Sequence, residues 1–122
     1  MELMSALLLF GVGHFSGAYM FYFFHRYIFH GPLGRYPLLR QWRSIHTNHH
    51  RNPNDPGTFF FPWWANVGIW VLAVGLFFVT PAFAIGLASF FAYYAYRHRD
   101  AHVGADTRSG RHHRSHHYGK AN

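Results

Sequence analysis

Apolar and polar blocks alternate along the chain. Residues 4–24 are apolar apart from two serines and one histidine, and about 20 helical residues at roughly 1.5 Å each match a bilayer core of about 30 Å. Residues 59–96 form a second apolar region, divided by Thr80 and Pro81, which is typical of a helical hairpin. The pattern predicts an all-α integral membrane protein with about three transmembrane helices in a single domain, residues 1–122.

The pattern alone does not decide where the second arm of the hairpin ends, and each apolar region has a rival interpretation. The second arm of the hairpin, residues 82–96, spans only about 22 Å as a helix, so it either stops short of a full crossing or continues past Arg97. A secretory signal is the rival interpretation of residues 4–24, but the segment carries Glu2 where a signal has basic residues. A buried hairpin of a soluble protein is the rival interpretation of residues 59–96.

The basic residues indicate the topology. All eleven lysines and arginines lie within residues 26–51 and 97–120. One crossing by residues 4–24 followed by a returning hairpin brings both regions to the same side, which the positive-inside rule makes cytoplasmic. The net charge of +7 is then explained by this topology and by anionic lipid headgroups. We therefore expect the lipid bilayer as a partner and no nucleic acid.

The composition excludes several kinds of site. The chain has no cysteine, which excludes disulfides, iron–sulfur clusters, thiolate-ligated haem and cysteine-type zinc sites. It has only four acidic residues, Glu2, Asp55, Asp100 and Asp106. The carboxylate-bridged di-iron sites of four-helix bundles need several glutamates, so that class is excluded as well.

Histidine is the residue that carries candidate chemistry. Ten of the twelve histidines fall into four clusters within residues 25–58 and 97–122, where short cytoplasmic helices are expected. The clusters are His25 and His30; His46, His49 and His50; His98 and His102; and His113, His116 and His117. Spacings of three and four residues place imidazoles on one helical face. His25 and His30 are about 140° apart on a regular helix, so they either serve two metals or sit on a helix distorted near Gly31.

Ten imidazoles indicate two metal ions, with about five ligands each. A single zinc ion needs three or four, and imidazole suits iron, zinc, copper and nickel. Asp55, Asp100 or Asp106 could accept an N–H from a ligating ring. His14, inside the first apolar segment, is expected to be a neutral packed residue, and His112 is set aside because His113 restores the spacing of the second cluster.

The four clusters resemble the histidine boxes of the fatty acid hydroxylase / sterol desaturase superfamily, from about Tyr22 to the C-terminus. The motifs that carry this resemblance are His25-Arg-Tyr-Ile-Phe-His30, His46-Thr-Asn-His49-His50, His98-x3-His102 and His113-Arg-Ser-His116-His117. The resemblance implies an integral membrane non-haem di-iron monooxygenase. It implies two Fe ions held by the ten histidines, with Zn as a substitute in purified protein. It also implies O2 as co-substrate, a membrane lipid substrate, and a b-type cytochrome, ferredoxin or reductase as electron donor.

The stretch after the second box, His49-His50-Arg-Asn-Pro53-Asn-Asp55, and the three-residue gap in the third box favour the fatty acid hydroxylase branch. A fatty acyl chain or a sphingolipid is therefore the expected substrate. A carotenoid or sterol hydroxylase or desaturase is the alternative within the superfamily, and a non-enzymatic membrane metal-binding protein is the alternative outside it. Family members usually have four membrane helices and continue beyond the fourth box, so we expect a C-terminally truncated member.

Overall fold

The computed structural model describes residues 2–104 and 106–118, so the expected ranges 1–122 and 97–122 lie partly outside the described residues. Every regular element in the described part is helical, as predicted. The elements are α1 (Glu2–Phe23), the π-helix η1 (Phe24–Phe29), the 3₁₀ turn η2 (Pro32–Arg35), α2 (Arg40–Arg51), the 3₁₀ turn η3 (Pro56–Thr58), α3 (Trp63–Phe77), α4 (Pro81–His102) and α5 (Arg108–Tyr118).

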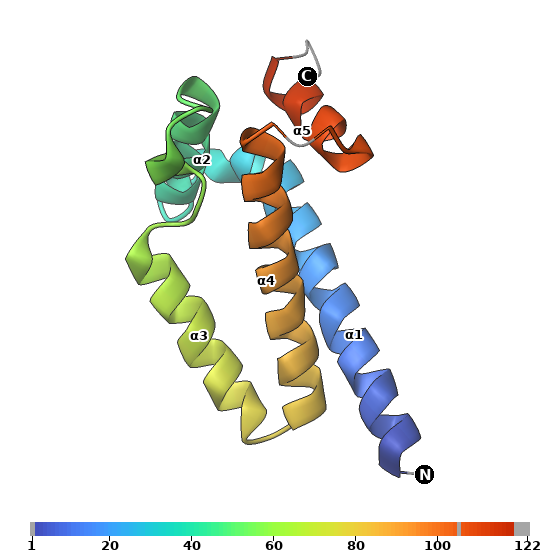
Figure 1. Cartoon of the computed structure of the whole chain (residues 1–122). Coiled ribbons are helices and arrows are strands. Elements are labelled where there is room, and N and C mark those ends of the chain that lie inside the picture. Colours follow the sequence, from blue (N-terminus) through green and yellow to red (C-terminus); the bar gives the residue numbers. More distant parts are fainter. Residues whose placement is uncertain (1, 105, 119–122) are drawn as a thin grey trace.

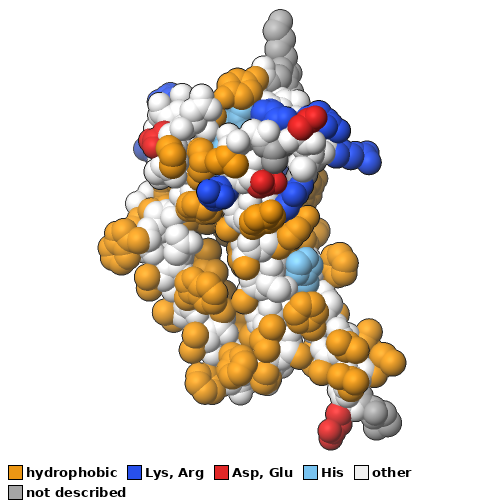
Figure 2. All heavy atoms as spheres, in the orientation of Figure 1, with side chains coloured by type: hydrophobic (Ala, Val, Ile, Leu, Met, Phe, Trp, Pro, Cys, Tyr) orange, Lys and Arg blue, Asp and Glu red, His pale blue; other side chains and the backbone are white. Residues whose placement is uncertain are grey.

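Two long helices, α1 and α4, lie side by side and form the main packing contact of the molecule (Figure 1). Helix α3 runs beside α4 as the other arm of a hairpin, while α2 and α5 gather at the end where α1 finishes and α4 ends (Figure 1). Figure 2 shows apolar side chains along the long helices and most of the charged side chains at the α2 and α5 end. The fold thus separates an apolar body from a polar head.

Glycines bring α1 and α4 into backbone contact. A Cβ atom added to Gly13 would overlap the carbonyl oxygen of Phe83, and one added to Gly86 would overlap the carbonyl oxygen of Phe10. A Cβ at Gly17 would lie 2.8 Å from the ring of Phe90. Small residues that allow such close approach are common where membrane helices pack. We call these three glycines the glycine seam.

The hairpin differs from its predicted bounds at both ends. Helix α3 begins at Trp63 rather than at Phe59, because Pro62 has an extended backbone conformation and caps the helix. Helix α4 continues past Arg97 to His102, which decides between the two alternatives left open by its length. Gly104 follows with a φ of +98°, a conformation that glycine adopts freely at a helix end. The resulting turn sends α5 back over the end of α4.

Two largely helical stretches of the described chain are long and apolar enough to cross a membrane, Glu2–Phe29 and Pro56–Phe77. The first contains the predicted segment 4–24, and the second overlaps the first arm of the predicted hairpin but begins three residues before it. Helix α4 does not meet the same measure within the described residues. A count of three crossings and the cytoplasmic position of the histidines therefore stay predictions.

Candidate metal centre

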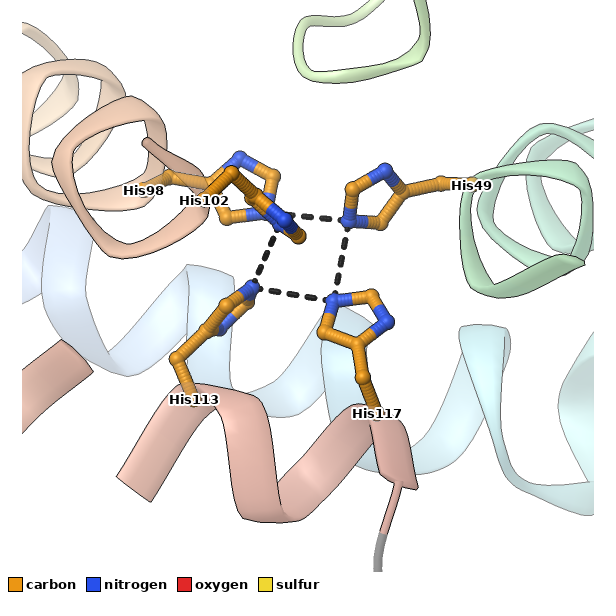
Figure 3. Close-up of side chains that lie close together, drawn as sticks. All are labelled: His49, His98, His102, His113 and His117. Carbon is orange, nitrogen blue, oxygen red and sulfur yellow. Dashed lines mark hydrogen bonds between the residues drawn. The ribbon is translucent and has the colours of Figure 1, made fainter. Parts of the chain in front are cut away.

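The polar head brings all four histidine clusters together. Two groups have ring nitrogens within 4.8 Å of one another, and each could hold a metal ion. The first, here the five-histidine group, contains His49, His98, His102, His113 and His117. The second, here the four-histidine group, contains His25, His30, His46 and His116. Figure 3 shows the five-histidine group, with rings from α2, α4 and α5 pointing toward a common centre.

His25 and His30 converge because the chain between them is a π-helix. The backbone N–H of His30 donates to the carbonyl oxygen of His25 over 3.2 Å, and the two ring centroids are 4.8 Å apart. A wider turn with bonds between residues i and i+5 replaces the regular helix over Phe24–Phe29. Of the two possibilities that the spacing left open, the structure has the distorted helix, and both rings belong to one group.

Distances between ring nitrogens fit a metal ion with several ligands. Four Nε2–Nε2 contacts of 2.9–3.2 Å link the members of the five-histidine group. Metal–nitrogen bonds of about 2.1 Å at right angles separate neighbouring donor atoms by about 3.0 Å, whereas a tetrahedron separates them by about 3.4 Å. The spacing is that of donors arranged at right angles.

Hydrogen bonds fix where two of the ring protons lie. The carbonyl oxygen of Phe59 can only accept, so His98 donates to it from Nδ1 over 2.8 Å. The Thr58 hydroxyl lies within donor distance of the carbonyls of Asp55 and Asn52, at 2.8 and 3.0 Å. It therefore accepts from Nδ1 of His49 at 3.3 Å.

The Nε2 atoms of His49 and His98 consequently carry lone pairs, and they face each other at 3.2 Å. These two rings are also the most buried of the polar side chains described, with 2% and 7% of their surface exposed. Two buried lone pairs at this distance repel unless a cation lies between them. The five-histidine group therefore fits a metal ion for two reasons: the Nε2 atoms of His49 and His98 are unprotonated, and the distances between ring nitrogens suit metal ligands.

Burial keeps the histidines of the head neutral. Desolvation, with a further contribution from neighbouring imidazoles, lowers the pKa of His49 to about 3 and that of His117 to about 3. The same causes lower the pKa of His113 to about 2 and that of His50 to about 4. A neutral imidazole is the form that binds metals, so these rings are ready ligands at neutral pH.

His50 lies between the two groups. Its Nε2 is 3.0 Å from Nε2 of His46 in the four-histidine group, and its ring centroid is 4.3 Å from that of His117 in the five-histidine group. With His50, all ten histidines of the four sequence clusters are gathered in the head. An even division of five and five requires His50 to join the four-histidine group.

The other two histidines lie apart from these groups. His112 is exposed on α5 while His113 points into the five-histidine group. His14 sits among aromatic rings between α1 and α4 and makes a 2.9 Å hydrogen bond with Ser89. Its packed position agrees with the interpretation of His14 as a structural residue.

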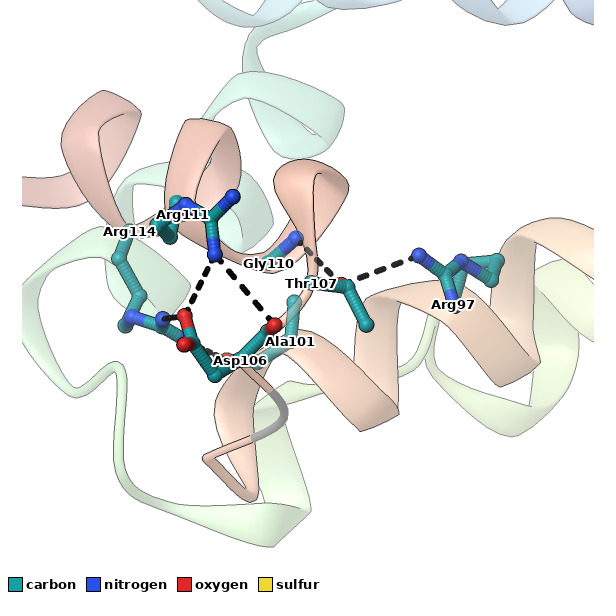
Figure 4. Close-up of polar contacts among 7 residues, drawn as sticks. All are labelled: Arg97, Ala101, Asp106, Thr107, Gly110, Arg111 and Arg114. Atoms are coloured by element: carbon teal, nitrogen blue, oxygen red, sulfur yellow. Dashed lines mark hydrogen bonds and ion pairs between the residues drawn. The ribbon is translucent and has the colours of Figure 1, made fainter.

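The aspartates have partners other than histidine in the described part of the chain. Asp106 pairs with Arg111 at 2.7 Å and with Arg114 at 3.9 Å (Figure 4). Asp100 pairs with Arg97, and Asp55 accepts from the backbone N–H of Gly57. The expectation that a carboxylate would accept a ligand N–H is thus not met by these residues. The acceptors are a hydroxyl and a backbone carbonyl instead.

Thr107 positions α5, the helix of the last cluster. Its hydroxyl accepts from the backbone N–H of Gly110 at 3.0 Å and from the Arg97 guanidinium at 3.1 Å (Figure 4). The first of these is a helix N-cap, and the second ties that cap to α4. The last cluster therefore belongs to a helix that is docked on α4.

A cavity of about 250 Å³ adjoins the histidines. His46, His49 and His98 are among its lining residues, and many of the others are apolar residues of α3 and α4. The phenylalanines at positions 59, 60 and 61 also line this cavity. From sequence alone, a role in packing or lipid contact could not be separated from a role in a substrate groove for these three residues. Their side chains form part of the cavity wall.

Comparisons with known proteins point to one family. The family model described as fatty acid hydroxylase matches residues 10–122. The comparison with curated proteins and the comparison with solved structures give no match. The matched range contains α4, α5 and both histidine groups, together with most of α1. The chain therefore belongs to the fatty acid hydroxylase family.

Proposed function

We propose that this protein is a membrane di-iron oxygenase that hydroxylates a C–H bond in a fatty acyl chain of a membrane lipid, using O2. The observation that carries the proposal is the junction of two histidine groups with an apolar cavity. Family membership supports an oxidoreductase acting on lipid, and the two apolar helices support a membrane protein.

Iron is the metal that we assign to the two groups, because imidazole accepts iron among other metals and the resemblance to the hydroxylase superfamily implies two irons. When bound, the two ions would supply dioxygen activation, chemistry that protein side chains lack. The ligands would be the five-histidine group at one ion and the four-histidine group with His50 at the other. The role of the chain is to keep these imidazole rings neutral by burying them and to direct their nitrogens toward the two metal positions.

The cavity is the proposed place of the acyl chain. It follows α4 from His98 to Leu87, a distance of about 16 Å for eleven helical residues, roughly half of the hydrocarbon thickness. Lining residues such as Trp70 and Phe91 can contact a hydrocarbon chain and exclude water. An acyl chain in this position has its reacting carbon beside the ring nitrogens, where hydroxylation has to occur.

Electrons must come from outside the chain, and we propose a b-type cytochrome, a ferredoxin or a reductase as the donor. The polar head carries exposed basic side chains, among them Arg51, Arg99 and Arg108. These surround the histidines on the face that we propose to be cytoplasmic. An acidic donor would be attracted to such a surface.

The metal part of the proposal can be tested on purified protein. We expect about two iron ions per chain by elemental analysis and a Mössbauer spectrum of high-spin iron bound by nitrogen. His46→Ala and His116→Ala should each lower the iron content, whereas the exposed His112→Ala should not. One iron or fewer per chain, with content unchanged in both variants, would contradict a di-iron centre.

The catalytic part needs a separate measurement. Lipids from a host with and without the gene should differ by a hydroxylated acyl chain, and growth under labelled O2 should place the label in the new hydroxyl group. A modified carotenoid or sterol would redirect the proposal to another branch of the superfamily. Two bound irons with no changed lipid, even when an electron donor is co-expressed, would favour a metal-binding protein without enzymatic activity.

A further inference from the structure

One loop contacts three members of the five-histidine group. We call residues 52–59 the 52–59 loop; it joins α2 to the stretch before α3 and includes η3. Its Thr58 hydroxyl accepts from His49 at 3.3 Å, and its Phe59 carbonyl accepts from His98 at 2.8 Å. The Phe59 ring also stacks on the His102 ring, with the two ring centroids 4.6 Å apart. The loop thus reaches histidines from two different helices.

Thr58 is itself held firmly. Its hydroxyl bonds the carbonyls of Asp55 and Asn52, and its backbone N–H donates to Asp55 over 2.9 Å. Asp55 in turn accepts from the backbone N–H of Gly57 at 2.9 Å. Because the hydroxyl proton is committed to the loop, the oxygen can only accept from the His49 ring. This arrangement aims the lone pair of His49 Nε2 at the centre of the group.

Among the described residues, the ring nitrogens of the four-histidine group form hydrogen bonds only with other histidines. The Phe29 ring stacks on His46 at 4.6 Å, and the Phe21 ring stacks on His25 at 5.8 Å. Within the part of the chain that the structure describes, each group has one buried ring nitrogen without a hydrogen-bond partner: Nε2 of His116 in this group and Nδ1 of His117 in the five-histidine group. Stacking restrains the plane of a ring but does not choose which nitrogen carries the proton.

We propose that Thr58 is a positioning residue for His49, and that the 52–59 loop makes the five-histidine group the tighter of two metal sites, the one filled first. This inference rests on the two-metal centre of the proposed function. Acceptors for the outward N–H of a ligating histidine fix its tautomer and raise its basicity, and their loss commonly weakens metal binding 10–100-fold.

Stepwise Co²⁺ titration of metal-free protein in detergent tests the inference, with ligand-field absorption and calorimetry as readouts. The wild type should bind two Co²⁺ ions in two resolved steps. Thr58→Val should weaken the first step about 10–100-fold and leave the second step unchanged, and Thr58→Ser should restore it. His30→Ala, in the four-histidine group, should abolish the second step alone.

Thr80→Val is the matched control, because Thr80 lies at the hairpin tip and its side chain makes no capping hydrogen bond. If Thr58→Val does not fold, Thr58→Ala removes the same hydroxyl without adding a methyl group. Two equal sites in the wild type, or equal weakening of both steps by Thr58→Val, would overturn the inference and leave the proposed function standing. Fewer than two Co²⁺ ions per chain would overturn both.

Discussion

His30 donates its backbone N–H to the carbonyl oxygen of His25, five residues earlier, and their rings lie 4.8 Å apart. This bond closes the π-helix η1 and gives both imidazoles one direction. Gly31 follows directly, and a Cβ atom there would lie 2.6 Å from the Tyr27 carbonyl oxygen and 2.7 Å from that of Arg26. The first histidine cluster therefore depends on a glycine that is not a ligand.

Gly31→Ala should therefore cost the protein one of its two metal ions, because the π-turn must open to admit the methyl group. Metal per chain in the purified variant is the measurement. Gly68→Ala is the control, since nothing lies within 4 Å of a Cβ atom at Gly68. Full metal content in Gly31→Ala would show that the π-turn is not needed to hold the four-histidine group.

The glycine seam predicts a difference in stability between two neighbouring glycines of α1. Gly13→Ala should lower the free energy of unfolding by about 1–3 kcal/mol, because the methyl group would overlap the Phe83 carbonyl oxygen. The change should appear as a lower melting temperature of the protein in detergent. Gly11→Ala should have little effect, since nothing lies within 4 Å of a Cβ there. Equal melting temperatures for the two variants would mean that α1 and α4 separate easily.

Acid should destabilise the metal-free protein. Burial and neighbouring imidazoles lower the pKa of His49 to about 3 in the fold, below the ordinary value of about 6.5 in an unfolded chain. The unfolded state therefore takes up the proton first, so stability is full above pH 6.5 and falls with pH by up to about 1.4 kcal/mol per unit for this histidine. Melting temperatures from pH 8 to pH 5 check this, and a flat profile would contradict it.

The cavity predicts an effect on turnover without an effect on metal. Ala73 lines the cavity on α3 and is 9% exposed, so Ala73→Phe should fill the space and reduce hydroxylation of long acyl chains. Val71, on the same helix, is 67% exposed, and Val71→Phe is the control. Product per bound iron is the quantity to compare. Unchanged turnover in Ala73→Phe would show that the acyl chain does not bind in this cavity.

The register of the last cluster gives a prediction that separates adjacent histidines. His113 contributes Nε2 to the five-histidine group at 2.9 Å from His102, while His112 is exposed. His113→Ala should lower the metal content to about one ion per chain, and His112→Ala should retain both. Loss of metal in His112→Ala would mean that α5 docks in another register.

Much of the head follows from the sequence because its signals are carried by side chains. Spacings of three and four residues identify helical faces, and the basic residues indicate that the clusters share one end of the molecule. The π-helix could not be predicted in this way, since a regular helix was the basis for separating His25 and His30. The two were left either on different metals or on a distorted helix, and only the backbone hydrogen bond decides.

The hydrogen-bond acceptors of Nδ1 in His49 and His98 could not be predicted either, for a different reason. Aspartates were the visible candidates, yet the acceptors are the Thr58 hydroxyl and the Phe59 carbonyl. A backbone carbonyl is present at every residue and leaves no mark in the sequence. Thr58 offered only a weak signal, a single hydroxyl at the edge of an apolar segment.

The glycine seam also bears on how the protein tolerates its surroundings. Helix α1 leads through η1 into His25 and His30, and α4 carries His98 and His102 at its far end. Because the two helices meet backbone to backbone, the separation of the two histidine groups is set by protein atoms alone. A thicker or thinner bilayer can tilt the pair as one body, so the spacing between the proposed irons stays independent of lipid composition.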